Sequence, residues 1–269
     1  MSDARDISAA RSLLFLPASN PRAIAKARQA GADFVALDLE DAVKPGDKDD
    51  ARAAAVEAVG EPWPMPVAIR VNGVGSEWHD ADCAAVAASK ADYVIVPRAA
   101  SAEVITAVAA ATAKPVLAMI ETAAGVLAAP GIAKVSTGLI AGTNDLRADL
   151  GIAIDGDRSA VAMALQWIVL AARAAEIPAF DGVFNGLEDE AGCGAEARQG
   201  RSLGFTGKSL IHPRQVAPAH AAFAPSTAEI ERAKRLIAAY DGGAARFEDQ
   251  MIERMHIAAA KRLLERSQG

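Results

Sequence analysis

The sequence predicts an α/β protein, a (β/α)₈ TIM barrel with an additional C-terminal helix. Eight short runs rich in Val, Ile, Leu and Phe alternate with longer Ala-rich stretches over about 240 residues, the usual span of such a barrel. Several of the short runs are almost wholly apolar, as is typical of parallel strands buried on both faces. The turn at 16–20 lacks the glycine-rich phosphate fingerprint of the rival fold, an open doubly wound sheet.

The elements are predicted as consecutive strand–helix units. Strands are expected at 12–17, 34–40, 66–72, 93–98, 115–121, 138–142, 179–184 and 209–213. Helices are expected at about 20–30, 48–59, 77–89, 101–112, 123–135, 158–176, 188–203 and 226–240. These units assign residues 1–241 to the barrel domain. Gly242 and Gly243 break the pattern, and residues 242–269 form a C-terminal extension with an amphipathic helix at about 249–267.

Helix-capping residues agree with several of these boundaries. Asn20 followed by Pro21 is typical of a helix start, because asparagine caps the first turn and proline fits its first position. Ser226 and Glu229 have the spacing of a capping box. Gly204 follows a helical stretch, where a residue of left-handed conformation commonly ends a helix.

Composition and charge exclude several classes of protein. The 269 residues are 52% hydrophobic, which is enough to fill a core and excludes intrinsic disorder. The net charge is −6 and no long Lys/Arg cluster occurs, so no nucleic-acid partner is expected. The sequence has no signal-peptide core in 1–11 and no membrane-length apolar run, so no membrane partner is expected. Cys83 and Cys193 form no CxxC motif, and we expect two free thiols in a cytoplasmic protein.

Charged and polar side chains gather at the ends of the predicted strands. The active site of a (β/α)₈ barrel lies at the carboxyl ends of its strands, so these residues should meet at one mouth although they are scattered in sequence. The residues in question are Asp38, Glu40, Asp41, Arg70, Asn72, Arg98, Glu121, Asn144, Asp145 and His212.

Glu121 and Asp145 end two adjacent strands and are the predicted metal ligands. Two carboxylates at neighbouring strand ends can share one hard cation, and oxygen ligands without paired histidines or thiols favour Mg²⁺ or Mn²⁺ over Zn²⁺. The alternative is that each carboxylate only caps the helix that follows it.

Arg70 follows an apolar strand and should lie within or just above the barrel, where an arginine needs an anionic partner. It either pairs structurally with Glu40 or Asp41, or clamps a substrate carboxylate with its two-pronged guanidinium. Glu40 and Asp41 are expected to hold metal-bound waters or to orient Arg70, unless they cap a helix. His212 and Cys83 are interpreted as structural, because His212 precedes Pro213 without a nucleophile partner and Cys83 lies among alanines.

At these residues the sequence resembles the citrate lyase β-subunit-like proteins of the HpcH/HpaI aldolase/citrate lyase family. The resemblance rests on six motifs in order: RSLLFLP from residue 11, LDLEDAV from 37, RVN from 70, IET from 120, GTND from 142 and GFTGKSLIHP from 204. Each motif alone is short, but their order is specific and covers nearly the whole chain.

The resemblance implies a Mg²⁺-dependent carbon–carbon lyase or synthase, often acting on acyl-CoA thioesters. It implies that Glu121 and Asp145 bind the metal and that Arg70 holds the carboxylate of an oxoacid. It also implies that a C-terminal segment from a neighbouring subunit can complete the mouth. The chain departs from many relatives by Asn144 in place of glutamate and by Arg98 in place of lysine.

The C-terminal segment departs from its relatives as well, since Glu253 stands where some of them carry an aspartate that acts as an acid in the neighbouring site. Arg11, with Arg22 and Lys26, is expected near the mouth and would favour an anionic CoA tail, although solvated helix faces explain Arg22 and Lys26 equally well. The resemblance therefore implies cleavage or synthesis of a citryl- or malyl-CoA-like 3-hydroxyacyl-CoA. The alternatives are an aldolase on free hydroxy-oxo acids and a catalytically weak thioester-binding barrel.

The last helix predicts a homo-oligomer, a trimer or hexamer. Its apolar residues recur at spacings of three and four and need a surface to cover them, whereas a closed barrel already has eight helices of its own. The helix either crosses to a neighbouring subunit, which would bring Glu253 toward that subunit's metal site, or packs on its own barrel.

Overall fold

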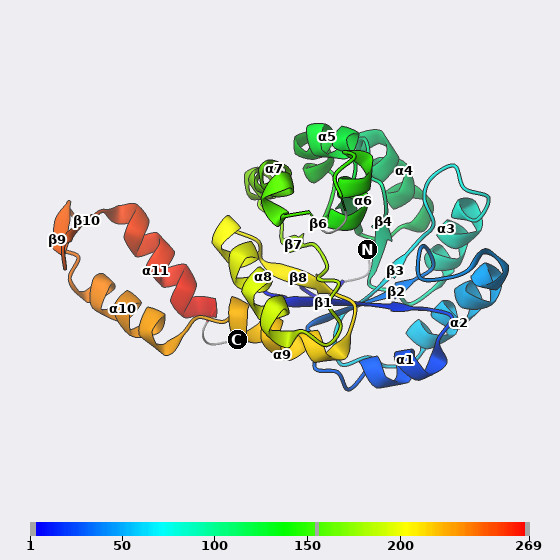
Figure 1. Cartoon of the computed structure of the whole chain (residues 1–269), viewed down its shortest axis with the longest axis horizontal. Coiled ribbons are helices and arrows are strands. Elements are labelled where there is room, and N and C mark those ends of the chain that lie inside the picture. Colours follow the sequence, from blue (N-terminus) through cyan, green and yellow to red (C-terminus); the bar gives the residue numbers. More distant parts are fainter. Residues whose placement is uncertain (1–3, 154–155, 267–269) are drawn as a thin grey trace.

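The computed structural model of the chain describes residues 4–153 and 156–266. Eight parallel strands close into a barrel in sequence order, β1 pairing with β8, and this confirms the predicted fold class (Figure 1). The strands are β1 (Ser12–Pro17), β2 (Phe34–Asp38), β3 (Val67–Arg70), β4 (Tyr93–Val96), β5 (Val116–Ile120), β6 (Gly138–Ala141), β7 (Ala179–Asp181) and β8 (Gly207–Leu210).

Helices follow the strands and cover the outside of the barrel (Figure 1). They are α1 (Pro21–Ala27), α2 (Lys48–Gly60), α3 (His79–Ala88), α4 (Ala102–Thr112), α5 (Ala123–Ala133), α6 (Thr143–Asp149), α7 (Ala162–Ala174), α8 (Glu190–Leu203) and α9 (Val216–Phe223). Three short 3₁₀ turns lie at Pro45–Asp47, Arg158–Val161 and Pro213–Gln215. In the described part of the chain, no helix combines the length and the apolarity that crossing a bilayer requires.

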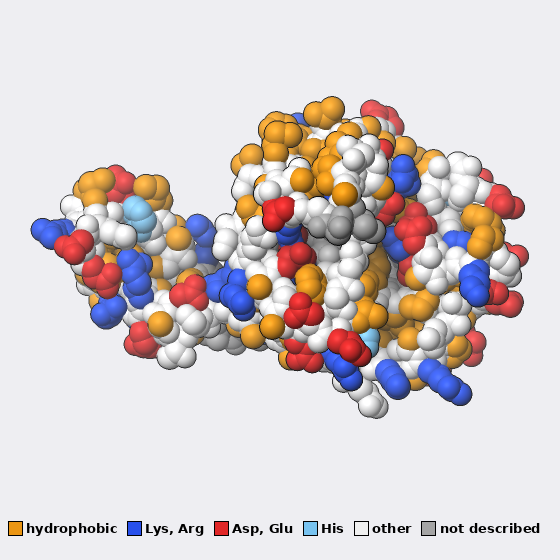
Figure 2. All heavy atoms as spheres, in the orientation of Figure 1, with side chains coloured by type: hydrophobic (Ala, Val, Ile, Leu, Met, Phe, Trp, Pro, Cys, Tyr) orange, Lys and Arg blue, Asp and Glu red, His pale blue; other side chains and the backbone are white. Residues whose placement is uncertain are grey.

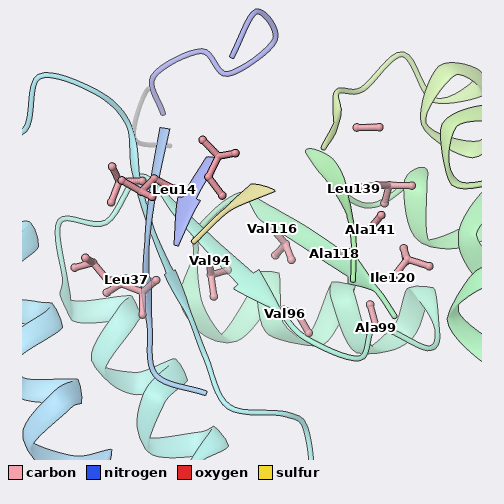
Figure 3. Packing of buried hydrophobic residues seen from close by; sticks show 14 of the residues in the cluster. Leu14, Leu37, Val94, Val96, Ala99, Val116, Ala118, Ile120, Leu139 and Ala141 are labelled. Atoms are coloured by element: carbon pink, nitrogen blue, oxygen red, sulfur yellow. The ribbon is translucent and has the colours of Figure 1, made fainter. Parts of the chain in front are cut away.

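Alternating side chains of the strands build two cores. Leu14 and Leu37 point outward and pack against the helices, where small alanines such as Ala99 allow helices and sheet to approach closely (Figure 3). Leu13 and Phe15 point inward and fill the barrel with residues of the other strands, namely Phe34, Ala36, Ala68, Tyr93, Ile95, Leu117, Met119, Ile140 and Phe180. The barrel interior is therefore a mainly apolar, packed core and no open channel.

The last part of the chain leaves the barrel as an arm. It consists of α10 (Thr227–Ala238), a hairpin of β9 (Ala245–Phe247) and β10 (Gln250–Ile252), and α11 (Arg254–Arg266), and it projects to one side of the barrel (Figure 1). The arm has its own apolar cluster, formed by Ala233, Leu236, Phe247, Ile252, Ile257 and Ala260. It is thus held together by its own contacts.

The prediction of the eighth barrel helix was wrong. The helix expected at 226–240 is α10, which packs against α11, whereas the shorter α9 packs against α8, β1 and β8 and takes the eighth place. The arm consequently begins at α10, before residue 242. The helix expected at 249–267 starts only at Arg254, because residues 245–252 form the hairpin, and its expected last residue, Ser267, lies outside the described residues.

Candidate active site

A cavity of about 380 Å³ opens at the carboxyl ends of the strands. Its walls combine apolar residues with four carboxylates, Asp38, Asp41, Glu121 and Asp145, and one guanidinium, that of Arg70. The other lining residues are Phe15, Leu16, Pro17, Ala42, Met119, Ala141, Gly142, Thr143, Asn144, Val183 and Ile211. The structure therefore brings most of the predicted strand-end residues together.

Glu121 follows β5 directly and points into this cavity with only 2% of its surface exposed. One carboxylate oxygen, Oε1, accepts a hydrogen bond from the backbone N–H of Arg98 at 2.6 Å. Arg98 has a left-handed backbone conformation, φ 48°, at the end of β4. Gly142 leaves room for the carboxylate, since a Cβ placed there would lie 2.3 Å from Glu121 Oε2.

Asp145 lies in the first turn of α6, immediately after β6, which pairs with β5. The nearest cation is the half-exposed Arg98, whose Nη1 lies 3.8 Å from Asp145 Oδ1. Asn144 beside it also lines the cavity, and its side-chain amide exchanges two hydrogen bonds, at 3.1 and 2.9 Å, with that of Asn185 in the segment after β7. Of these two neighbours, Asp145 is the one that pairs with a cation at the mouth.

Burial raises the pKa of Glu121 to about 7. The N–H of Arg98 and the charge of Arg70 act in the opposite direction, while the negative charges of Asp145 and Asp41 raise the pKa further. The ionised carboxylate is therefore insufficiently compensated by the protein itself. A divalent cation between Glu121 and Asp145 would supply the missing positive charge.

The donor set fits a Mg²⁺ ion. Mg²⁺ commonly takes one or two protein carboxylates and keeps several waters, and the cavity beside Glu121 and Asp145 has room for them. Within residues 4–153 and 156–266, no group of three or more His, Cys, Asp or Glu side chains is placed to hold a metal. The two-carboxylate arrangement thus suits a hard, hydrated cation better than Zn²⁺.

Arg70 is buried at the end of β3, and its main partner is Asp38, whereas the sequence pointed to Glu40 or Asp41 as its partner. Its Nε and Nη2 bind the two oxygens of Asp38 at 2.7 and 2.6 Å. The two residues are register partners on β2 and β3, so both point into the barrel. Nη1 lies 2.8 Å from Glu40 Oε2 and 3.8 Å from Asp41 Oδ2. The expected structural pairing with Glu40 is therefore present, and one edge of the guanidinium faces the acidic side of the mouth.

Glu40 and Asp41 are both carboxyl groups with raised pKa values. Burial raises the pKa of Glu40 to about 8, against the attraction of Arg70, and its Oε2 has no aligned hydrogen-bond donor. Burial also raises the pKa of Asp41, which is more exposed. A carboxyl group of pKa near 8 can hold a proton at neutral pH and release it to a base, which is the requirement for a general acid.

Lys48 supports this loop and was not predicted. It is buried, and its ammonium group donates to the carbonyl oxygens of Leu39 and Glu40 at 2.7 and 2.8 Å and to Oδ1 of Asn72 at 2.6 Å. It therefore fixes the backbone that carries Glu40. The sequence offers no pattern for this role, because a lysine after a turn is usually solvated.

The expected position of Arg11 at the mouth was wrong. Arg11 precedes β1 and binds both oxygens of Asp33, which precedes β2, at 2.9 and 3.0 Å. Both residues lie at the amino ends of the strands, opposite the cavity. A residue that precedes a strand lies at the strand's amino end, whereas the mouth is formed by the carboxyl ends.

Three further expectations have different outcomes. His212 is structural, since its ring accepts a hydrogen bond from the N–H of Arg214 and caps the turn after β8. Cys83 is buried on α3, and burial raises the pKa of its thiol to about 11, which confirms a packing role. Glu253 follows β10 at the distal end of the arm, away from the barrel of its own chain (Figure 1). Its role at a neighbouring mouth stays a prediction.

These features define a class of protein, a (β/α)₈ barrel with paired carboxylates and a buried arginine at its carboxyl-end mouth. Residues 11–213 match the family described as HpcH/HpaI aldolase/citrate lyase. The chain belongs to this family of aldolases and citrate lyases, which confirms the resemblance read from its six motifs.

Individual relatives agree with this membership. A (3S)-malyl-CoA thioesterase of Cereibacter sphaeroides is 42% identical, the alignment covering 96% of this chain and 95% of that protein. The citrate lyase subunit beta of Leuconostoc mesenteroides subsp. cremoris is 32% identical over 94% and 92% of the two chains. The crystal structure of protein CitE from Mycobacterium tuberculosis in complex with magnesium, acetoacetate and coenzyme A has a TM-score of 0.89 and 32% identity. That match covers 97% of this chain and 100% of the other, so it includes the arm.

Proposed function

We propose that the chain is a Mg²⁺-dependent carbon–carbon lyase or synthase that acts on a short 3-hydroxyacyl-CoA of the malyl- or citryl-CoA kind. The observation that carries the proposal is the convergence of Glu121, Asp145 and Arg70 on one cavity in a member of this family. Relatives described as acting on malyl-CoA and as binding magnesium, acetoacetate and coenzyme A support this substrate class.

Each residue of the mouth has a part in this proposal. Glu121 and Asp145 hold Mg²⁺, which when bound supplies a Lewis acid that polarises the keto oxygen of the oxoacid. Nη1 of Arg70, which is not used by Asp38 and contacts Glu40, binds the carboxylate of the oxoacid. Bound in this way, the oxoacid is held in a fixed orientation toward the acyl group, which lowers the entropy cost of the reaction.

Proton transfer is assigned to the carboxyl groups on the opposite side of the mouth. Glu40 has a pKa of about 8 and lies beside Arg70, so it can carry a proton at neutral pH. Asp41 lines the cavity and, with Asp38, balances the positive charge of Arg70. Glu253 of a neighbouring subunit is proposed as an additional acid, with the arm crossing between subunits of a homotrimer or a hexamer. The cytoplasmic location also stays a prediction.

A second reaction on the same substrate is favoured by a specific observation. The relative that is 42% identical is described as a (3S)-malyl-CoA thioesterase, which names hydrolysis of the thioester of malyl-CoA. The two reactions share the acyl-CoA and the acid side chains, and they differ in whether a carbon–carbon or a carbon–sulfur bond breaks. An aldolase on free hydroxy-oxo acids is the remaining alternative and requires no CoA.

Product analysis separates these reactions. The purified chain is incubated with malyl-CoA, citryl-CoA and the corresponding free acids, with Mg²⁺ or with EDTA, and oxoacid, free thiol and acyl-CoA are each measured. The proposal expects an oxoacid and an acyl-CoA in equal amounts, only with Mg²⁺. Free thiol without oxoacid identifies the thioesterase, and cleavage of free acids alone identifies the aldolase. Turnover of none of these compounds contradicts the enzymatic proposal.

A further inference from the structure

Lys208 is a fully buried lysine that the proposed chemistry does not use. It lies in β8 within the GFTGKSLIHP segment, with 0% of its surface exposed. Its ammonium group donates to the carbonyl oxygen of Gly182 at 2.5 Å, to Oε1 of Glu196 at 2.6 Å and to Oδ2 of Asp181 at 3.3 Å. A buried ammonium group is tolerated only when partners of this kind replace its water.

Lys208 belongs to a cluster of four charged side chains, which we call the β7–β8 cluster: Arg158, Asp181, Glu196 and Lys208. Arg158 binds Oδ1 of Asp181 at 2.5 Å and Oε1 of Glu196 at 2.8 Å. Two positive and two negative charges therefore balance one another. Helix α8 approaches this cluster closely, since a Cβ on Gly200 would lie 2.4 Å from Oδ2 of Asp181.

The cluster fixes the backbone immediately after β7. Strand pairing ends at Asp181, so Gly182 has no partner in the sheet. Its N–H donates instead to Oδ1 of Asp181 at 2.8 Å, and its carbonyl oxygen accepts from Lys208. Both polar backbone groups of Gly182 are thus held by side chains of the β7–β8 cluster.

Gly182 in turn supports the helix that carries Asp145. A Cβ on Gly182 would lie 2.5 Å from both Cγ2 and Oγ1 of Thr143, so the backbone packs directly against this side chain. Thr143 is the first residue of α6, and Asp145 is in the same turn. The amide pair of Asn144 and Asn185 joins the same two segments a second time.

We infer that Lys208 is a positioning residue for the metal site. It holds the backbone after β7 in the place against which the first turn of α6 packs, and it thereby sets the position of the Asp145 carboxylate relative to Glu121. The inference rests on the proposed role of Glu121 and Asp145 as Mg²⁺ ligands. It also gives the buried lysine of the GFTGKSLIHP segment a function beyond the stability of the barrel wall.

The test compares Mg²⁺ affinity with stability. Removing Lys208 alone would leave the cluster with unbalanced negative charge, so the variant of choice is the charge-balanced K208M/E196Q, in which Arg158 still pairs with Asp181. Mg²⁺ binding is measured by titration calorimetry and unfolding by heating in EDTA. The dissociation constant for Mg²⁺ is expected to rise roughly 10- to 100-fold, the usual effect of losing a group that orients a metal ligand.

A matched control lies at the other end of the barrel. Arg11 and Asp33 form a partly buried ion pair, and the charge-balanced R11M/D33N should lower the unfolding temperature while the Mg²⁺ affinity stays unchanged. If K208M/E196Q behaves like this control, being less stable but unchanged in Mg²⁺ affinity, the inference is overturned.

A second variant tests the packing of the segment after β7 against α6 without changing any charge. Gly182→Ala pushes against Thr143 and should weaken Mg²⁺ binding, and the double variant G182A/T143A, which frees the space again, should recover it. If K208M/E196Q does not fold, Gly182→Ala and G182A/T143A replace it as the test. A wild-type Mg²⁺ affinity of Gly182→Ala overturns the inference. Absence of Mg²⁺ binding in the wild-type protein would instead overturn the proposed metal site, and with it this inference.

Discussion

Glu121 is the residue on which the electrostatics of the mouth depend. It is almost fully buried, accepts one hydrogen bond from the backbone and has a pKa raised to about 7. A group in this environment is costly to ionise unless a cation is present, and such groups are common at functional sites. The same argument gives Asp145 its importance, because a shared cation stabilises both carboxylates at once.

Replacing either ligand should abolish Mg²⁺ binding while the fold survives. We expect Glu121→Gln and Asp145→Asn to lose saturable Mg²⁺ binding in calorimetry. Glu121→Gln should also unfold at a higher temperature than wild type in EDTA at pH 8, because it removes a buried charge that the protein does not fully compensate. Asp149→Asn is the matched control on the same helix, since Asp149 is exposed and accepts a hydrogen bond from the N–H of Ala123, which an asparagine oxygen can also accept. Unchanged Mg²⁺ affinity in both ligand variants would refute the assignment.

Glu40 gives the stability a predictable pH dependence. Its pKa rises from the ordinary 4.5 to about 8 in the folded protein, so the folded state binds this proton more tightly than the unfolded state. The stabilisation is complete below about pH 4.5 and is lost as the pH rises toward 8. Glu121 and Asp41 change stability in the same direction.

In EDTA, Glu40→Gln should therefore show a shallower fall of the free energy of unfolding between pH 5 and 8 in urea titrations. Parallel curves for the two proteins would contradict a raised pKa at Glu40.

At the scale of elements, the metal site depends on how closely β5 and the end of β6 approach. Gly142 has an ordinary negative φ of −98°, so alanine is compatible with its backbone, and the nearest obstacle is the Glu121 side chain. Gly142→Ala should displace that carboxylate and weaken Mg²⁺ binding roughly 10-fold or more. Gly131→Ala, in helix α5 with no atom near the new Cβ, should leave Mg²⁺ binding unchanged and stabilise the protein by about 0.5–1 kcal/mol. Equal Mg²⁺ affinity in both variants would show that Gly142 is not needed for the site.

Apolar periodicity predicted most of the elements but failed where charge or length broke the pattern. The eighth strand was expected at 209–213 and lies at Gly207–Leu210. The prediction began too late because a charged residue such as Lys208 is not expected in a buried strand, and its partners from β7 and α8 cannot be read from the sequence. Helices α6 and α9 are too short for the periodicity to show, at seven and eight residues. Strand ends predicted Glu121, Asp145 and Arg70 correctly as neighbours. The pairing of Asp38 with Arg70 and the role of Lys48 were missed, because a side chain's partners depend on the register between strands and on packing.

At the scale of the whole molecule, surfaces remain that a second copy of the chain could cover. The arm carries the exposed methionines Met251 and Met255, at 66% and 63% exposure. Apolar side chains also gather over α5 and α7, where Leu127, Met163 and Leu170 are exposed (Figure 2). Contiguous exposed apolar patches are typical of surfaces that associate with other proteins, and association of this chain through these side chains is a prediction.

Polar substitution on the arm should therefore reduce the oligomer. M251E/M255E changes only exposed positions, so the chain should fold normally and have a lower native mass by light scattering, with reduced turnover if Glu253 acts at a neighbouring mouth. Lys261→Glu, on the exposed face of α11, makes the same change in net charge and should leave the mass as it is. A wild-type chain that is already a monomer, or a native mass of M251E/M255E equal to wild type, would contradict association through these methionines.

The central claim is that a Mg²⁺ ion at the barrel mouth binds the oxoacid part of the substrate. A crystal of the full chain soaked with Mg²⁺ and oxaloacetate tests it most directly. The account predicts a metal ion at about 2.0–2.1 Å from one oxygen each of Glu121 and Asp145, as Mg²⁺ geometry requires, and an oxoacid carboxylate in contact with the guanidinium of Arg70. A metal held by other residues, or oxaloacetate seated in the cavity without a metal, would contradict it.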